Sequence, residues 1–225
     1  RQSPTPMRAY LKAHRPYFGL FTVWAVIAGL IIATTEQPDL HLTFNNVNVA
    51  GWDNFFRYAT YLGDGYFAYG LAIAVCFVRF RWGASVFLAC LMAGLTSQFL
   101  KQQVFGPVPR PAAFFGEPTP LYLVPGVDMH SYHSFPSGHS AIAFALATSL
   151  MLLTPWRWLR AGLFFLALTA AYSRVYLSQH FFEDIYAGSF VGLIAALIAH
   201  RLVVVRRPKA TAPESTEIAE TEPEL

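Results

Sequence analysis

Residues 82–100 read WGASVFLACLMAGLTSQFL, nineteen consecutive positions without an ionised side chain. A helix of about 17–25 predominantly apolar residues crosses a bilayer core, so this stretch alone is long enough to span a membrane. Similar stretches recur along a chain of 225 residues that is 55% hydrophobic and 13% charged, with a mean hydropathy of +0.39. An ordinary soluble domain is far less apolar. The composition therefore predicts an integral membrane protein.

Six apolar segments alternate with short basic connections and longer, aromatic-rich, acidic ones. We expect each segment to be a membrane-spanning helix, so the predicted fold class is all-α, a six-transmembrane helical bundle in one domain of residues 1–207. No cleavage site of the Ala-x-Ala type follows the first segment, which we interpret as a retained span and not as a signal peptide. The segments are Phe18–Thr34, Tyr66–Val78, Trp82–Leu100, Ser140–Leu153, Leu159–Tyr176 and Ile185–Val205.

The basic residues predict the orientation of this bundle. Twelve of the 16 lie before the first span, between the second and third, between the fourth and fifth, or after the sixth. All four places fall on one face, which the positive-inside rule makes cytoplasmic, together with both termini. The acidic residues 208–225 are expected to form a disordered cytoplasmic tail. The opposite face keeps only four basic residues, which are Arg57, Lys101, Arg110 and Arg174.

On that outer face, Gly51–Tyr61 carries aromatic residues at mixed helical spacing. Aromatic rings are favoured at the membrane–water boundary, so one interpretation is an interfacial segment between spans 1 and 2. A loop packed over the bundle explains the same composition equally well.

The most informative spacing is Ser173-Arg174, five residues, His180, three residues, Asp184. Residues four apart share a helix face, and a carboxylate bonded to one imidazole nitrogen leaves the other nitrogen free as a base or nucleophile. A purely structural His–Asp pair at a helix start fits the same spacing. Arg174, at the outer end of a span, requires an anionic partner, either Asp184 or a substrate phosphate.

Pro136-Ser137-Gly138-His139 has the composition of a helix start. Proline is accepted in a first turn and serine caps it, while glycine lets an anion approach the backbone N–H groups at the positive end of the helix dipole. His139 would then stand beside a bound anion as a general acid. Alone, this tetrapeptide is an ordinary capping sequence.

Together with Lys101 and Arg110-Pro111, these two motifs resemble those of the type 2 phosphatidic acid phosphatase superfamily. That superfamily also contains bacterial glucose-6-phosphatase-like lipid phosphatases and the vanadium haloperoxidases. The pattern Ser-Arg-x5-His-x3-Asp is matched at every fixed position, and so is Pro-Ser-Gly-His. The resemblance covers residues from about Lys101 to Asp184.

The third family pattern, Lys-x6-Arg-Pro, is matched with altered spacing. Counting back from Arg110 places Gln103 where the lysine is expected, and the nearest lysine is Lys101. Either the turn at 106–109 contains two extra residues and Lys101 remains in the phosphate site, or Gln103 replaces the charge with an amide. We favour Lys101, because it directly ends an uncharged span.

The resemblance implies a mechanism for these residues. His180 would attack phosphorus and form a phosphohistidine, oriented by Asp184, while His139 would protonate the leaving group and then activate water. The phosphate oxygens would be held by side chains and backbone groups of Lys101, Arg110, Arg174, Ser137 and Gly138. No metal or other cofactor is expected, because the three cations take that part and the sequence has no carboxylate cluster to bind one.

Several other residues receive lesser roles. We interpret Cys76 and Cys90, in the middle of apolar stretches, as core residues, since no Cys-x-x-Cys spacing is present. Candidates for lining the substrate entrance are His41, His130, Tyr132 and His133, and candidates for the lipid interface are Phe114, Phe115 and Tyr122.

The expected function is hydrolysis of a lipid phosphate or diphosphate at the outer, periplasmic face of a bacterial inner membrane. The candidate substrates are undecaprenyl diphosphate, phosphatidylglycerol phosphate, phosphatidic acid and a lipid A phosphate; no nucleic acid partner is expected. A lipid phosphotransferase would use the same site. A vanadium haloperoxidase is disfavoured because those enzymes resemble soluble helical proteins, and a transporter or flippase because the sequence shows no inverted repeats or broken helices.

Overall fold

The computed structural model describes residues 7–47, 49–118 and 120–205, and within those ranges every regular element is a helix. The all-α prediction is therefore confirmed. The predicted acidic tail and its boundary at residue 207 lie outside the described residues.

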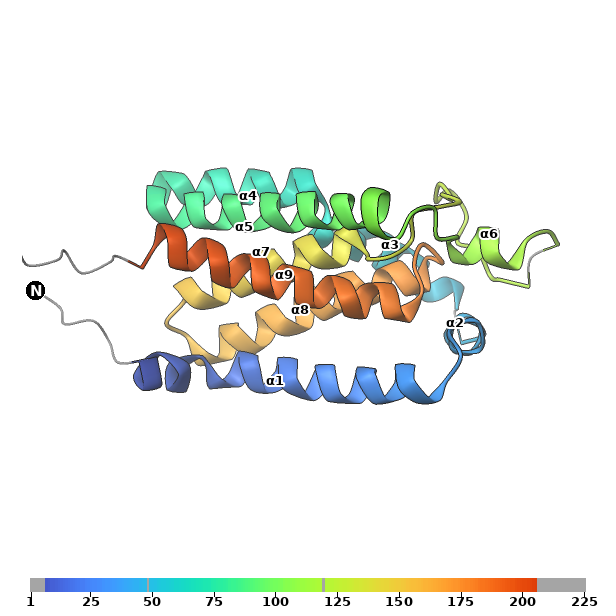
Figure 1. Cartoon of the computed structure of the whole chain (residues 1–225), viewed down its shortest axis with the longest axis horizontal. Helices are drawn as coiled ribbons and strands as arrows, with labels where there is room; N and C mark the ends of the chain where they lie inside the picture. The colour runs from blue at the N-terminus through green and yellow to red at the C-terminus, as the bar shows by residue number, and fades with distance from the viewer. Residues whose placement is uncertain (1–6, 48, 119, 206–225) are drawn as a thin grey trace, which may run out of the picture.

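Six of the described helices have 14 residues or more and run side by side along the long axis of the molecule (Figure 1). Each predicted apolar segment falls largely on one of them. They are α1 (Met7–Thr34), α4 (Gly65–Val78), α5 (Phe80–Phe99), α7 (Gly138–Leu153), α8 (Arg157–Tyr176) and α9 (Phe182–Val203).

Short helical segments fill the connections at one end of the bundle, where α2, α3 and α6 lie (Figure 1). These segments are α2 (Gln37–Asn45), η1 (Ala50–Trp52), α3 (Asp53–Ala59), η2 (Thr60–Gly63), α6 (Pro111–Phe115) and the π-helical turn η3 (Leu100–Val104), which extends α5.

Length and composition support fewer membrane spans than the six predicted. In the described residues, three helical segments are long and apolar enough to cross a bilayer: 14–34, 80–104 and 182–203. A fourth is obtained if 53–63 and 65–78, which meet at a bend of 54°, count as one span. The helix α7 has only 16 residues, or about 24 Å, and α8 carries three arginines, which lowers its hydropathy. The count of six spans thus stays a prediction.

The helix α7 occupies the centre of the bundle and contacts α5, α8 and α9 (Figure 1). Its packing with α9 is very close, because α9 places glycines against the α7 backbone. A Cβ atom on Gly188 would come within 2.5 Å of the Ser137 carbonyl oxygen, and one on Gly192 within 2.2 Å of the Ala141 carbonyl oxygen. Only glycine fits at such an approach. The starts of α7 and α9 are therefore held together.

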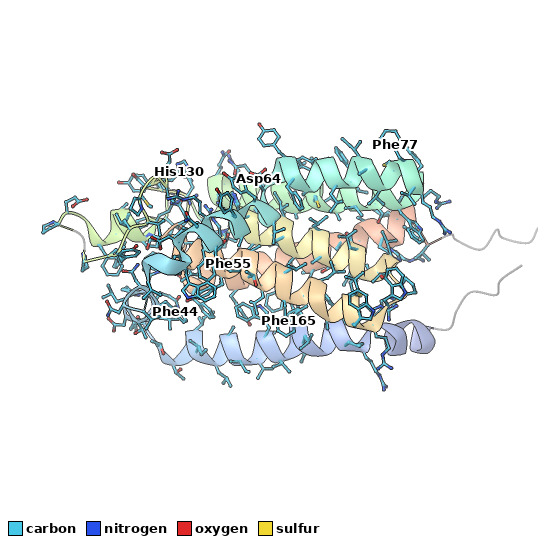
Figure 2. The ribbon with its side chains drawn as sticks, turned by 180° about the vertical axis from the view of Figure 1, so that it is seen from behind. Phe44, Phe55, Asp64, Phe77, His130 and Phe165 are labelled. Carbon is cyan, nitrogen blue, oxygen red and sulfur yellow. The ribbon has the colours of Figure 1, made fainter. Side chains whose placement is uncertain are left out.

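The two ends of the bundle differ in charge. The start of α1, the α4–α5 and α7–α8 connections and the end of α9 gather at one end (Figure 1), and Arg81 there donates to the Val203 carbonyl oxygen at 3.0 Å. Phe77 lies at this end, opposite Phe44 and His130 (Figure 2). Arg79, Arg157 and Arg201 belong to the same connections and helix ends. Among the described residues, Arg79, Arg81, Arg157 and Arg201 thus share one end of the molecule, as the sequence predicts for them.

The aromatic segment Gly51–Tyr61 becomes η1, α3 and the start of η2. Phe56 stacks on Tyr176 with ring centroids 4.2 Å apart, so the segment packs over α8. Phe55 and Tyr58 remain exposed on its other side. One face of the segment therefore fits the packed-loop interpretation, and the other face keeps exposed aromatic rings. Of the two free cysteines, Cys90 is buried as predicted, and Cys76 is only half-buried.

Candidate active site

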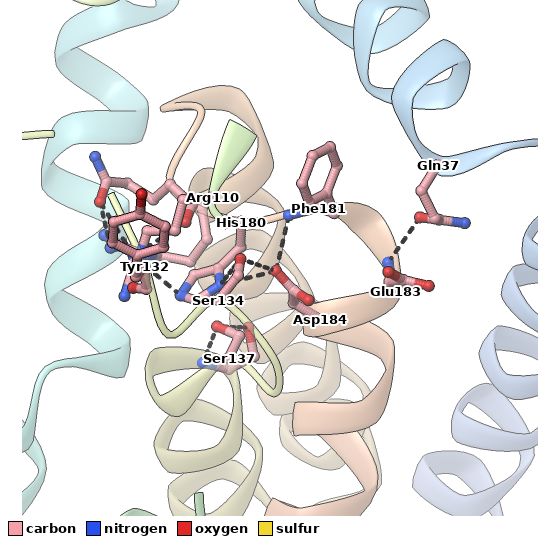
Figure 3. Close-up of polar contacts among 12 residues, drawn as sticks. Gln37, Arg110, Tyr132, Ser134, Ser137, His180, Phe181, Glu183 and Asp184 are labelled. Carbon is pink, nitrogen blue, oxygen red and sulfur yellow. Dashed lines mark hydrogen bonds and ion pairs between the residues drawn. The ribbon is translucent and has the colours of Figure 1, made fainter. Parts of the chain in front are cut away.

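His180 and Asp184 form a buried pair at the junction of α8 and α9 (Figure 3). The Nδ1 atom of His180 lies 3.0 Å from Oδ2 of Asp184, which also accepts the backbone N–H of Phe181 at 2.9 Å. Asp184 sits in the first turn of α9, where its carboxylate satisfies an otherwise unpaired N–H group. With Nδ1 bound in this way, Nε2 is the nitrogen of His180 that remains for chemistry.

Ser134 is a member of this group that the sequence analysis missed. Its hydroxyl donates to Oδ2 of Asp184 at 2.5 Å and lies 3.4 Å from Nδ1 of His180 (Figure 3). The same carboxylate oxygen therefore has three donors around it. Nothing in the tripeptide His133-Ser134-Phe135 signals this role, because the contact depends on how the loop before α7 folds back over α9.

Arg110 reaches the reactive side of His180. Its Nη1 atom lies 3.5 Å from Nε2 of His180 and donates to the backbone oxygen of Gln179 at 3.0 Å. Its Nε donates to the backbone oxygen of Tyr132 at 3.0 Å (Figure 3). Tyr132, a predicted entrance residue, thus contributes its main chain here, while its side chain is exposed.

Arg174, buried in the last turn of α8, does not pair with Asp184. Its Nη1 donates to the hydroxyl of Thr60 in η2 at 2.8 Å, and its Nη2 lies 3.5 Å from Oε1 of Gln179. Among the described residues Asp184 pairs with His180 instead. Of the two anionic partners considered for Arg174, the internal carboxylate is therefore not used.

The structure gives Lys101 and Gln103 different surroundings. Lys101 is 8% exposed, and its ammonium group interacts electrostatically with Arg110, Arg174 and Asp184. Gln103 is exposed. The π-helical turn η3 carries both residues, and it directs only the lysine into the buried cluster. The preference for Lys101 is therefore supported by its position.

His139 lies in the first turn of α7 at the same end of the bundle. It interacts electrostatically with Arg174, Lys101, Arg110 and His130, and also with His180. The structure thus brings both predicted catalytic imidazoles and all three predicted phosphate-binding cations to one site.

The expectation for the Ser137 backbone is corrected. Its N–H donates to the backbone oxygen of Asp184 at 3.0 Å, so it does not remain free for a phosphate. The Ser137 hydroxyl caps α7 by accepting from the Ser140 N–H at 3.3 Å. Gly138 then begins the helix, where the first N–H groups have no intrahelical acceptor. Those N–H groups, and not that of Ser137, are the candidate donors to an anion.

One other expectation was also wrong. His41 does not line an entrance: it is buried in α2, with Nε2 3.3 Å from the Ser178 hydroxyl and its ring stacked near Phe115. The hydroxyl of Tyr122, a predicted lipid-interface residue, donates to Asp53 at 2.6 Å. By contrast, His130 and His133 are exposed near the site, and Nδ1 of His133 lies 3.3 Å from the Lys101 carbonyl oxygen. Phe114 is half exposed.

Burial, together with the surrounding charges, keeps the imidazole of His180 neutral. Burial lowers the pKa of His180 well below its ordinary value, and the positive charges of Arg110, Lys101 and Arg174 act in the same direction. A neutral imidazole has a lone pair on Nε2, so it is the nucleophilic form. The same cations attract an anion that approaches Nε2, which makes the site suited to a phosphate group.

The described residues contain no group of three or more His, Cys, Asp or Glu side chains arranged to hold a metal ion.

Comparison with known proteins gives a consistent result. A model of the PAP2 superfamily matches residues 82–208. A lipid A 4′-phosphatase of Bacteroides thetaiotaomicron is 29% identical over 178 residues, which cover 74% of this chain and 78% of that protein. The structure of Aquifex aeolicus LpxE superposes with a TM-score of 0.65 at 29% identity, covering 76% of this chain and 98% of that one.

A second solved structure shares the fold. It is a transmembrane PAP2-type phosphatidylglycerolphosphate phosphatase from Bacillus subtilis, with a TM-score of 0.61 at 22% identity, covering 84% of this chain and 96% of that one.

Proposed function

The chain belongs to the PAP2 superfamily, and from that premise we propose that it is a membrane lipid phosphatase that works through a phosphohistidine on His180. The observation that carries the proposal is the convergence of His180–Asp184, His139 and three cations at one end of the bundle. These groups come from η3, the residue before α6, the first turn of α7, the last turn of α8, the α8–α9 turn and the first turn of α9.

In the first step, Nε2 of His180 attacks phosphorus and the bond from phosphorus to the leaving oxygen breaks. Without substrate, burial and the nearby cations lower the pKa of His139 to about 3. In this proposal the negative charge of the bound phosphate counters those cations, so His139 takes up a proton on binding. Its imidazolium then gives that proton to the leaving oxygen, and the lipid leaves as a neutral alcohol or as a shorter phosphate. The phosphorylated His180 becomes cationic, and the Nδ1–H bond to Asp184 stabilises this charge.

The cations act on the transferred group. Charge on the three equatorial oxygens must be stabilised during phosphoryl transfer. Arg110 lies beside Nε2 of His180, and Lys101 and Arg174 surround the same region. The N–H groups at the start of α7 add the positive end of a helix dipole. In this proposal these fixed groups replace a metal ion in binding the phosphate.

In the second step, His139, now neutral, takes a proton from water, and the water oxygen attacks phosphorus. The bond between phosphorus and Nε2 of His180 breaks, inorganic phosphate leaves, and both histidines return to their starting states. A lipid hydroxyl in place of water would make the same site a phosphotransferase, which the experiment below distinguishes.

We place the site at the periplasmic face of a bacterial inner membrane. The site occupies the end of the bundle opposite the basic connections, and the positive-inside rule assigns the basic end, with the start of α1 and the end of α9, to the cytoplasm. A lipid A phosphate is the first substrate to test, because the Bacteroides relative is a lipid A 4′-phosphatase. Phosphatidylglycerol phosphate, phosphatidic acid and undecaprenyl diphosphate follow.

The test is phosphate release from these four lipids by purified protein in detergent, with a chelator present. We expect at least one lipid to be hydrolysed, and His180→Ala to reduce the rate about 10⁴-fold or more, since it removes the nucleophile. Full activity of His180→Ala would contradict the mechanism, and the absence of release from all four lipids would contradict the function. Labelled phosphate that appears on a second lipid would identify a phosphotransferase.

A further inference from the structure

Gln179 lies between the two arginines of the site. It belongs to the turn that joins α8 to α9 and is 2% exposed. Its side-chain oxygen Oε1 lies 3.4 Å from Nη1 of Arg110 and 3.5 Å from Nη2 of Arg174. One neutral oxygen atom is thus the acceptor shared by two buried guanidinium groups. In the motif Ser-Arg-x5-His, position 179 is one of the five that the pattern leaves open.

The orientation of this amide is fixed from its other end. Nε2 of Gln179 donates to the backbone oxygen of Asp128 at 3.0 Å and lies 3.3 Å from the sulfur of Met129. The nitrogen therefore faces an acceptor in the loop between α6 and α7, here called the outer loop, and the oxygen is left to face the arginines. The main chain of Gln179 is bonded as well, with its N–H donating to the Arg174 carbonyl oxygen at 2.9 Å.

A neutral acceptor is the side chain that this position requires. Two guanidinium groups repel each other, and burial strengthens the repulsion. A carboxylate at this position would hold both arginines as ion pairs, but it would also cancel the charge that attracts a phosphate. An apolar side chain would leave the repulsion unopposed and N–H groups unpaired. An amide oxygen bonds both guanidinium groups and leaves their charge in place.

We propose that Gln179 is a positioning residue that holds Arg110 and Arg174 at the separation needed to grip one phosphate group. The inference rests on the proposed function, because it assigns both arginines to the same phosphate. Through Asp128 it also links this separation to the backbone of the outer loop. Gln179 itself need not touch the substrate for this role.

The experiment compares Gln179→Glu, which keeps the size and adds a charge, with Gln179→Met, which keeps the length and removes the acceptor. Gln103→Glu is the matched control, because it adds the same charge at an exposed position. Binding of orthovanadate and inorganic phosphate is measured as the rise in Tm with ligand concentration, which does not depend on turnover. Steady-state kinetics on the best lipid substrate give kcat and KM.

We expect Gln179→Glu to weaken phosphate and vanadate binding at least 10-fold and to raise KM more than it lowers kcat. Its Tm without ligand should be no lower than that of Gln179→Met, because the new carboxylate pairs with both arginines. Gln179→Met should lose both Tm and anion affinity. Gln103→Glu should behave as the wild type.

Anion binding by Gln179→Glu equal to that of the wild type would overturn the inference, and so would a wild type that binds neither anion. A role limited to anchoring the outer loop would lower the Tm of both variants and leave anion affinity unchanged, which also overturns it. The proposed function fails separately, if the wild type binds phosphate or vanadate but releases no phosphate from any lipid.

Discussion

Lys101 and Gln103 stand two residues apart on η3, yet only the lysine is buried beside Arg110 and Arg174. A buried ammonium group among two other cations is electrostatically unfavourable unless an anion joins them. Asp184 supplies one negative charge to this cluster of three cations, and in the proposed function a bound phosphate supplies the rest. Gln103, which the motif spacing alone would select, has no such surroundings.

Substitution of the two residues should separate them. We expect Lys101→Ala to lower kcat/KM for the lipid substrate about 100-fold or more, because it removes a charge that stabilises the transferred phosphoryl group. Gln103→Ala should leave kcat/KM within about twofold. Phosphate release measured for both variants at equal protein concentration checks this. The opposite order would assign the family lysine position to Gln103.

The contacts of Ser134 and Gln179 could not be predicted from the sequence. The motifs supply His180, Asp184, Arg110 and Arg174, because their spacing resembles that of the PAP2 superfamily patterns. The hydroxyl that reaches Asp184 and the amide between the arginines sit at positions whose residue types carry no such signal. Their roles come from a loop that crosses over the start of α9, and single-sequence periodicity says nothing about such crossings.

The packing of α7 against α9 is a property of the helix pair. Gly192 has no room for a side chain, since its Cβ would lie 2.2 Å from the Ala141 carbonyl oxygen, whereas Gly162 in α8 has nothing within 4 Å. The same substitution should thus have opposite effects at the two glycines.

We expect Gly192→Ala to lower the free energy of unfolding by about 1–3 kcal/mol through overpacking. It should also reduce activity, because His139 lies at the start of α7 and His180 lies just before α9. Gly162→Ala should be neutral or stabilising by up to about 1 kcal/mol, since alanine has the higher helix propensity. Tm and phosphate release of both variants in the same detergent check the prediction. Equal effects at the two sites would show that the close approach is not limiting.

The helix α2 docks through a histidine, so its attachment should depend on pH. Burial lowers the pKa of His41 from 6.5 to about 4. The folded state therefore keeps His41 neutral below pH 6.5, whereas the unfolded chain binds a proton there, and stability falls as pH decreases from about 6.5 to about 4. At pH 5 the resulting cost is about 2 kcal/mol.

The measurement is the Tm of the wild type and of His41→Gln at pH 7.5 and at pH 5.0. The wild type should lose about 5 °C more Tm over this interval than the variant, because only the wild type has the buried His41. The contributions of the other histidines are the same in both proteins. An equal loss in the two proteins would contradict a neutral, buried His41.

At the scale of the whole molecule, the distribution of arginines predicts which end faces the cytoplasm. Tyr132 is exposed at the site end, and Arg157 is exposed at the opposite end. In a background with Cys76 and Cys90 replaced, intact cells treated with a membrane-impermeant maleimide should label Tyr132→Cys and leave Arg157→Cys unlabelled. The reverse pattern would place the site in the cytoplasm.

Much of the architecture could be predicted because it depends on composition and periodicity. The apolar segments gave the six long helices, and the arginines near Arg79, Arg157 and Arg201 gave the shared end. The number of spans could not be settled in this way, because α7 is short and α3–η2–α4 is bent by 54°. The burial of His41 and the hydrogen bond of Tyr122 to Asp53 were missed, because both depend on contacts between distant connections.

The glycine contacts between α7 and α9 divide the molecule into a fixed part and an adaptable part. Both imidazoles stand at the starts of two helices whose backbones touch, so little sequence change is tolerated beneath them. The segments around them, α2, α6 and the stretch 120–134, meet no such restriction along their exposed sides. A descendant of this protein that acts on a different lipid headgroup would therefore be expected to change residues in α2, α6 and 120–134 and to keep those at the starts of α7 and α9.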